Sequence, residues 1–251
     1  MDNFKTKIDN QSNKTSKSSQ DKPKNLHEGH RERMKKEFLA NGLDNLPEHK
    51  MLEMLLFYCV PRRDTNELAH QLIEKYKSLA GVLDAPAEEL VKFSGITENG
   101  VVLLKLIIPL ARAYGLGGET KDPVFKSVED IGDYLLKRYF GFTEEAFSIV
   151  CMDSKGKLLD FKILGEGDIN SVGVSTRNVI QIALNSNAVC VVLAHNHPSG
   201  IALPSNQDIA ITEQIKTALS HVNVRVIDHI IIADNDYVSM YQSKKYKHIF
   251  L

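Results

Sequence analysis

The 251-residue sequence has almost no excess of charge of either sign, because 31 Lys and Arg residues are balanced by 32 Asp and Glu residues, a formal net charge of -1. This balance provides no general attraction to nucleic acid or to a membrane surface. Binding of a polyanion would therefore require a local basic patch.

Cysteine is also scarce. The three thiols, Cys59, Cys151 and Cys190, lie far apart in apolar segments and form no Cys-x-x-Cys pair. An odd number of separated cysteines argues against a disulfide framework and favours buried free thiols in a reducing compartment. The first residues lack the apolar core of a secretory signal, and no stretch approaches membrane-spanning length. We expect a cytoplasmic protein without a membrane partner.

The sequence nevertheless contains enough apolar residues for a real core. With 43% hydrophobic and 25% charged residues, it has the composition of a soluble globular protein, and its length allows two domains. Residues 1–25 are an exception, since they are rich in Lys, Ser, Asn and Gln and almost free of large apolar side chains. This composition predicts a disordered tail.

Residues 26–114 carry apolar side chains at helical spacing, which predicts a smaller all-α N-terminal domain. Within it, the segment Phe93-Ser94-Gly95-Ile96-Thr97 separates two helical patterns and resembles the turn of a helix-hairpin-helix element, which presents backbone amides to a DNA phosphate. Thr97 stands where such a turn commonly has a second glycine, and Lys105 and Arg112 are few basic residues for a DNA clamp. A DNA-binding hairpin and a purely structural one both stay open.

Residues 115–125 begin with Gly-Leu-Gly-Gly and continue with polar residues, which predicts a linker. Residues 126–251 alternate helical and strand patterns, so we expect one α/β domain in which helices flank a mixed sheet. The expected helices cover residues 127–138, 175–185 and 208–220. The expected strands cover residues 147–152, 157–164, 189–194, 224–233 and 237–241.

The strand at residues 189–194 leads into two histidines, His195 and His197. Side chains two residues apart on a strand point the same way, so these imidazoles should converge. Asp208, where the next helix begins, can bring its carboxylate back toward them. Two imidazoles and one carboxylate leave a fourth tetrahedral position for water, which is the arrangement of a catalytic zinc site. The pattern Ser205-x-x-Asp208 also fits a helix capping box, and the two interpretations are compatible.

The order of these residues carries a resemblance to a known family. His195-x-His197-Pro198 followed by Ser205-x-x-Asp208 resembles the JAMM signature of JAB/MPN metalloproteases. The longer string from His195 to Gly200, together with Pro204-Ser205, is similar to the bacterial RadC family. Asp228-His229-Ile230-Ile231-Ile232 and the helical region with its Gly95-Ile96 turn extend the likeness over nearly everything from about residue 27. The resemblance implies an MPN-like fold for residues 126–251 and zinc as the metal.

A JAMM site also uses an upstream glutamate as general acid/base, because a proton must travel from the activated water to the leaving group. By this resemblance the role falls to Glu145, with Glu144 and Glu166 as alternatives. Ser205 would hydrogen-bond the water or the oxyanion of a tetrahedral intermediate. Asp228 and His229 lie on a strand of otherwise apolar residues, where they could orient a metal ligand, but we expect His229 to be a satisfied core residue.

These observations predict a zinc-dependent hydrolase of the JAMM type that cleaves a peptide or isopeptide-like amide. The rival is a DNA-associated protein, because RadC proteins carry a DNA-repair label and the helical domain resembles a DNA-binding hairpin. In that case the MPN-like domain would be a nuclease or a non-catalytic metal-binding module. The expected partners are thus a protein or peptide-like substrate and, through residues 26–114, DNA.

Overall fold

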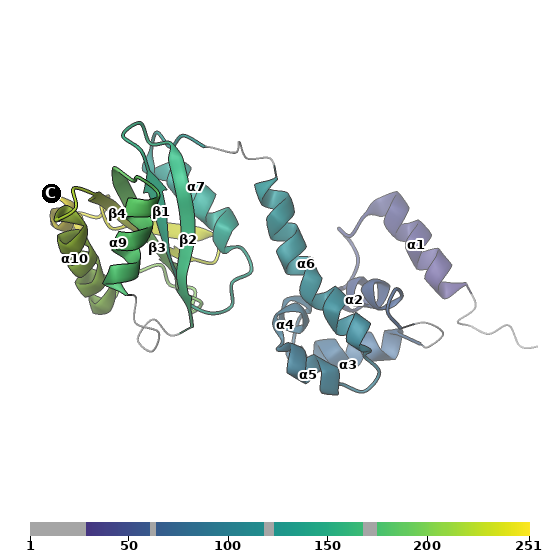
Figure 1. Ribbon diagram of the computed structural model, residues 1–251. Helices are drawn as coiled ribbons and strands as arrows, with labels where there is room; N and C mark the ends of the chain where they lie inside the picture. The colour runs from purple at the N-terminus through teal and green to yellow at the C-terminus, as the bar shows by residue number, and fades with distance from the viewer. Residues whose placement is uncertain (1–28, 61–63, 118–122, 168–174) are drawn as a thin grey trace, which may run out of the picture.

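The computed structural model describes residues 29–60, 64–117, 123–167 and 175–251. It contains a helical region followed by a five-stranded mixed sheet with flanking helices (Figure 1), which confirms the predicted fold class. The tail predicted at residues 1–25 lies outside the described residues.

The helical region is built around a core of aliphatic side chains that includes Leu52, Leu56, Leu72, Leu90 and Leu104, all fully buried. Six helices lie within the described residues up to position 116. They are α1 (His30–Asn41), α2 (Glu48–Leu56), α3 (Asn66–Tyr76), α4 (Leu79–Asp84), α5 (Ala87–Lys92) and α6 (Glu98–Leu116).

The turn between α5 and α6 uses its threonine as a helix cap. The Thr97 hydroxyl accepts a hydrogen bond from the Gly100 amide at 3.1 Å and donates one to the Cys59 carbonyl at 3.2 Å. The two basic residues of α6 are engaged as well. Lys105 donates to the carbonyls of residues 83 and 85, and Arg112 donates to the carbonyl of Phe140. These contacts tie α6 to α4 on one side and to the sheet domain on the other.

Helix α6 corrects the expectation that no stretch approaches membrane-spanning length. It has 19 residues and a mean hydropathy of 1.4, and only 17% of its apolar window is buried. Val102, Leu106, Leu110 and Tyr114 form an exposed row along it at four-residue spacing. By length and composition alone this helix is apolar enough to cross a membrane, while its opposite face packs into the helical core.

Residues 115–117 and 123–125 of the segment predicted as a linker, residues 115–125, belong to the described structure. Helix α6 continues to Leu116, whereas Val124 forms a β-bridge with Lys157 and Phe125 is buried against the sheet domain. The glycine at position 115 lies in open space, so nothing in the described structure opposes a helix there.

The sheet has the order β2-β1-β3-β4-β5, and only β3 and β4 run parallel among its neighbours. Its strands are β1 (Ala146–Met152), β2 (Leu158–Glu166), β3 (Cys190–Asn196), β4 (Arg225–Ala233) and β5 (Asp236–Ser239). The helices of this domain are α7 (Val128–Tyr139), α9 (Thr176–Asn185) and α10 (Asn206–Ser220), with a short 3-10 helix η1 at Lys247–Phe250.

Helices cover both faces of the sheet, with α7 on one face and α9 and α10 on the other (Figure 1). The central strands β1 and β3 are buried along their whole length, as expected for strands packed on both sides. Alternation along β3 turns Val192 and Ala194 toward α7, and Leu193 toward α10. His195 therefore faces α10, while Asn196 faces α7.

Candidate metal centre

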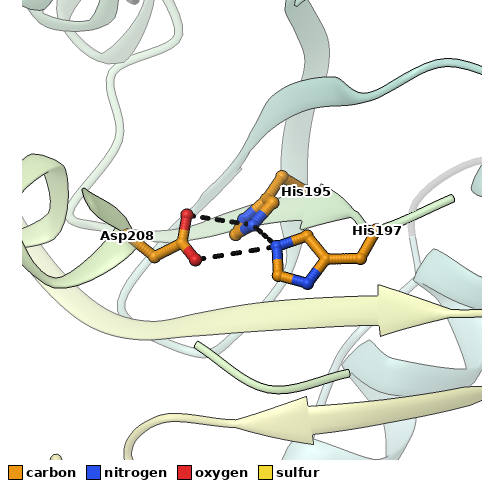
Figure 2. Close-up of side chains that lie close together, drawn as sticks. All are labelled: His195, His197 and Asp208. Carbon is orange, nitrogen blue, oxygen red and sulfur yellow. Dashed lines mark hydrogen bonds and ion pairs between the residues drawn. The ribbon is translucent and has the colours of Figure 1, made fainter. Parts of the chain in front are cut away.

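His195, His197 and Asp208 meet at the end of β3 and the start of α10 (Figure 2). His195 Nε2 lies 3.1 Å from Asp208 Oδ1 and 2.8 Å from His197 Nε2, and His197 Nε2 lies 3.6 Å from Asp208 Oδ2. His195 and Asp208 are buried, whereas His197 is partly exposed. Two of the candidate ligands are thus buried, and the third, His197, is accessible to solvent.

Asp208 is held at this place by the start of its helix. The Ser205 amide donates to Asp208 Oδ2 at 2.7 Å, and the Asp208 amide donates to the Ser205 hydroxyl at 3.2 Å, which together form a capping box. Oδ1 remains directed at His195. The capping pattern and the metal-ligand pattern in the sequence therefore describe the same carboxylate.

The atoms that converge here suit a divalent metal ion. The His197 Nδ1 atom lies 2.9 Å from the carbonyl oxygen of Ile201, which can only accept, so Nδ1 carries the proton. When His197 is neutral, it therefore presents a lone pair at Nε2, beside a carboxylate that also only accepts. In a tetrahedral site with zinc–nitrogen distances of about 2.0–2.1 Å, ligand atoms stand about 3.3 Å apart. His195 Nε2 lies 2.8 Å from His197 Nε2 and 3.1 Å from Asp208 Oδ1, close to that value, and the candidate ligand atoms all lie within 4.8 Å of one another.

The electrostatics of the group follow from these contacts. Burial raises the pKa of Asp208, but the hydrogen bonds that His195 and His197 donate when protonated outweigh burial and hold this pKa far below its ordinary value. The hydrogen bond to Asp208 raises the pKa of His197 against the opposing effect of its own burial. The carboxylate is therefore ionised at any physiological pH and provides the negative charge that a cation requires.

Of the two neighbouring glutamates considered for proton transfer, Glu145 has the charge that acts on His197. It directly precedes β1 and is half-buried, and its negative charge contributes to the raised pKa of His197. The Glu144 carboxylate lies beside Gly167 instead, on an exposed side chain. The side chain of Glu166 falls outside the described part of the structure. The assignment to Glu145 stays a prediction.

Ser205 is exposed at the rim of the site. Its oxygen already accepts the Asp208 amide, but a hydroxyl retains one proton to donate. A cavity of about 680 Å³ lies next to the centre and is lined by residues of both domains. Its polar lining includes Asp84 of the helical region and Asn196, His197 and Asp234 of the sheet domain. Its volume lies in the range of pockets that hold small molecules.

Two side chains at the centre were not predicted from the sequence as parts of it. His229 Nε2 lies 2.8 Å from His195 Nδ1, and Thr212 Oγ1 lies 2.6 Å from His229 Nδ1. Burial, and then the nearby His195, lower the pKa of His229 well below its ordinary value. The signal in the sequence was the pair Asp228-His229 within a mostly apolar strand, and we had expected His229 to be a satisfied core residue.

The chain thus has a mixed sheet between helices, with a His-x-His pair at the end of one strand and an aspartate in the first turn of the following helix, as expected of a JAB-type domain. Residues 125–246 match the family model described as a RadC-like JAB domain. A UPF0758 protein of Fusobacterium nucleatum subsp. nucleatum is 35% identical over 220 residues, which cover 85% of this chain and 95% of the relative. A UPF0758 protein of Pseudoalteromonas translucida is 34% identical over 208 residues, covering 83% and 93%. The chain belongs to this RadC-like UPF0758 family.

Proposed function

We propose that the chain is a zinc-dependent hydrolase of the JAMM type that cleaves a peptide or isopeptide-like amide. The observation that carries this proposal is the convergence of two imidazole nitrogens and an ionised carboxylate within 4.8 Å of one another, next to an open cavity. Three protein ligands leave one coordination position free, as in catalytic zinc sites. The family's hydrolase-type domain supports the same conclusion.

In this proposal each residue has a separate task. His195, His197 and Asp208 hold the zinc ion, which supplies a Lewis acid and lowers the pKa of water when bound. Glu145 accepts a proton from the attacking water and donates it to the leaving amine. Ser205 donates its hydroxyl proton to the developing oxyanion. The cavity beside His197 receives the segment of substrate that flanks the scissile bond.

Metal content provides the first test. Purified full-length protein dialysed against zinc should retain one zinc ion per chain, and His195→Ala and His197→Ala should retain less than a tenth of that. His221→Ala is the matched control, since His221 is exposed at the far end of α10. Absence of zinc from the wild type, or retention of zinc by both variants, would overturn the metal centre.

Activity is tested by a comparison of neighbouring glutamates. Extracts of cells that lack the protein are treated with wild type, Glu145→Gln or Glu144→Gln, and new termini and released isopeptide-linked chains are identified by mass spectrometry. Species cleaved by wild type and Glu144→Gln but not by Glu145→Gln are the expected result. Cleavage by Glu145→Gln reassigns the proton carrier, and no cleavage by wild type contradicts the hydrolase proposal.

Two further expectations from the sequence stay predictions. DNA binding by residues 26–114 gains no support from the basic residues of α6, because Lys105 and Arg112 bond backbone carbonyls of the protein itself. Full-length protein that binds duplex DNA at low salt, with an affinity that falls steeply as salt rises, would revive the DNA-associated alternative. We place the protein in the cytoplasm, because Cys59, Cys151 and Cys190 are free buried thiols, as a reducing compartment allows.

A further inference from the structure

A chain of three buried hydrogen bonds connects two of the metal-ligand residues behind the metal centre. It begins at His195 Nδ1, which lies 2.8 Å from His229 Nε2. His229 Nδ1 lies 2.6 Å from Thr212 Oγ1, and this hydroxyl donates to the backbone carbonyl of Asp208. His195, His229 and Thr212 are fully buried, so water does not take part in these bonds.

The direction of every bond follows from the carbonyl at one end. A carbonyl oxygen only accepts, so the Thr212 hydroxyl donates its single proton to the backbone carbonyl of Asp208. Thr212 Oγ1 must then accept from His229, which places a proton on His229 Nδ1. Among the described residues no carboxylate bonds the imidazole ring of His229, whose two nitrogens face His195 and Thr212, and an unpaired buried cation is costly, so His229 is neutral. Its Nε2 atom therefore accepts a proton from His195 Nδ1.

This order determines which nitrogen of His195 faces the metal centre as a ligand. With the proton held on Nδ1, the Nε2 atom carries a lone pair, and it lies 3.1 Å from the acceptor atom Asp208 Oδ1. Two acceptors at this distance repel each other unless a cation or a proton lies between them. The hydrogen bond at Nδ1 of His195 thus leaves its Nε2 atom without a proton and able to bind a metal ion.

We propose that His229 and Thr212 are positioning residues that fix the tautomer of His195 and hold that ligand in register with Asp208. The proposal rests on the zinc site of the proposed function. Its three bonds link β3, β4 and α10, so the two buried ligands are connected behind the site as well as through the metal. Any two hydrogen-bonding groups would satisfy a core histidine. The His229 ring instead bonds His195 and, through Thr212, the backbone of Asp208.

The first test is spectroscopic and needs neither metal nor substrate. In metal-free, full-length protein labelled with ¹⁵N-histidine, His229 should carry its proton on Nδ1 and have an unprotonated Nε2. The resonances are assigned by their absence from His229→Leu, or from His229→Gln if the leucine variant does not fold. A proton on His229 Nε2 would overturn the proposal, because the order of donors deduced from the Asp208 carbonyl would then be reversed.

Zinc affinity provides the second test, measured by competition with a chromogenic chelator. Loss of a residue that orients a metal ligand typically weakens binding by about 10–100-fold. Thr212→Val, which keeps the shape of the side chain but removes its hydroxyl, should weaken zinc binding at least about tenfold. Thr212→Ser restores the hydroxyl and should bind within about threefold of wild type.

The control variant for this test removes a buried hydroxyl elsewhere. Ser239 is 5% exposed and donates to Asp228, with no contact to the metal-ligand residues. Ser239→Ala should therefore lower stability without changing zinc affinity. Folded Thr212→Val that binds zinc as tightly as wild type would overturn the positioning role. If wild type binds no zinc at all, the proposed function fails. The measured tautomer of His229 still tests the order of the hydrogen bonds in that case.

Discussion

The side-chain amide of Asn196 bonds the backbone on both sides of Glu145. Asn196 Oδ1 accepts from the Ala146 amide at 2.7 Å, and Nδ2 donates to the Glu144 carbonyl at 3.0 Å. The middle residue of His-Asn-His thus faces away from the two histidines and fixes the segment that carries the predicted proton carrier.

Replacement of this amide should therefore separate stability from metal binding. Asn196→Ala leaves the Ala146 amide without its acceptor, so the free energy of unfolding should fall by about 2 kcal/mol. Zinc affinity should stay within about threefold of wild type, because Asn196 faces α7 and contacts none of the metal-ligand side chains. Urea unfolding and chelator competition measure the two quantities. Tenfold weaker zinc binding at unchanged stability would show that Asn196 acts on the metal centre itself.

Zinc should stabilise the folded chain by mass action. At a free zinc concentration 100 times the dissociation constant, the free energy of unfolding should rise by about 2.7 kcal/mol if the unfolded chain does not bind zinc. Thermal unfolding with zinc, with EDTA, and with zinc restored after EDTA measures the shift. His197→Ala should unfold at the same temperature with and without zinc. An equal zinc-dependent shift in that variant would place the bound ion elsewhere.

Asp228 predicts a pH dependence of stability. Burial raises the pKa of this carboxyl from 3.8 to about 6, although Ser239 and two backbone amides donate to it. Since the folded-state pKa is raised, the contribution of Asp228 is fully present below about pH 3.8 and is lost as the pH rises through about 6. The difference corresponds to about 3 kcal/mol.

The test compares wild type with Asp228→Asn from pH 4 to pH 7.5. The free energy of unfolding of wild type should fall relative to that of the variant as the pH rises, since asparagine has no charge to bury. Asp236→Asn, at an exposed position of β5, is the control and should follow wild type. A constant difference between wild type and Asp228→Asn across this range would contradict the raised pKa.

Gly132 lets helix α7 approach the last strand of the sheet. A methyl group at this position would overlap the aromatic ring of Tyr237. Gly132→Ala should therefore lower the free energy of unfolding by about 1–3 kcal/mol, and a second change, Tyr237→Ser, should recover part of that loss. The same substitution at Gly115, which has open space around it in α6, should be neutral or slightly stabilising. Chemical denaturation of the four proteins measures these effects.

Local periodicity explains which parts of the centre were predictable. The strand period of two turned His195 and His197 to one side, and the capping pattern located Asp208 at the first turn of α10. Both signals lie within a few residues of the chain. The end of α6 was less predictable, because the glycine at 115 reads as a break in a sequence although nothing in the fold opposes a helix there.

Such local patterns could not predict contacts between segments that lie far apart in the sequence. His229 reaches His195 only because β3 and β4 are parallel with Leu193 opposite His229, and Thr212 joins them from α10. The choice between Glu144 and Glu145 depends on the direction of two adjacent side chains, which Asn196 sets from 50 residues away along the chain. Sequence patterns specify the faces of strands and the capped starts of helices, but not the register that brings separate elements together.

The capping box at the start of α10 has a consequence for metal selectivity and binding entropy. Because Ser205 already immobilises the Asp208 carboxylate, this side chain loses its conformational entropy on folding rather than on metal binding. In the proposed zinc site an incoming ion would meet a preorganised oxygen rather than a mobile one, and a larger ion would require this carboxylate to leave its capping bonds. The two-residue motif that begins the helix would thereby favour a small ion at this place.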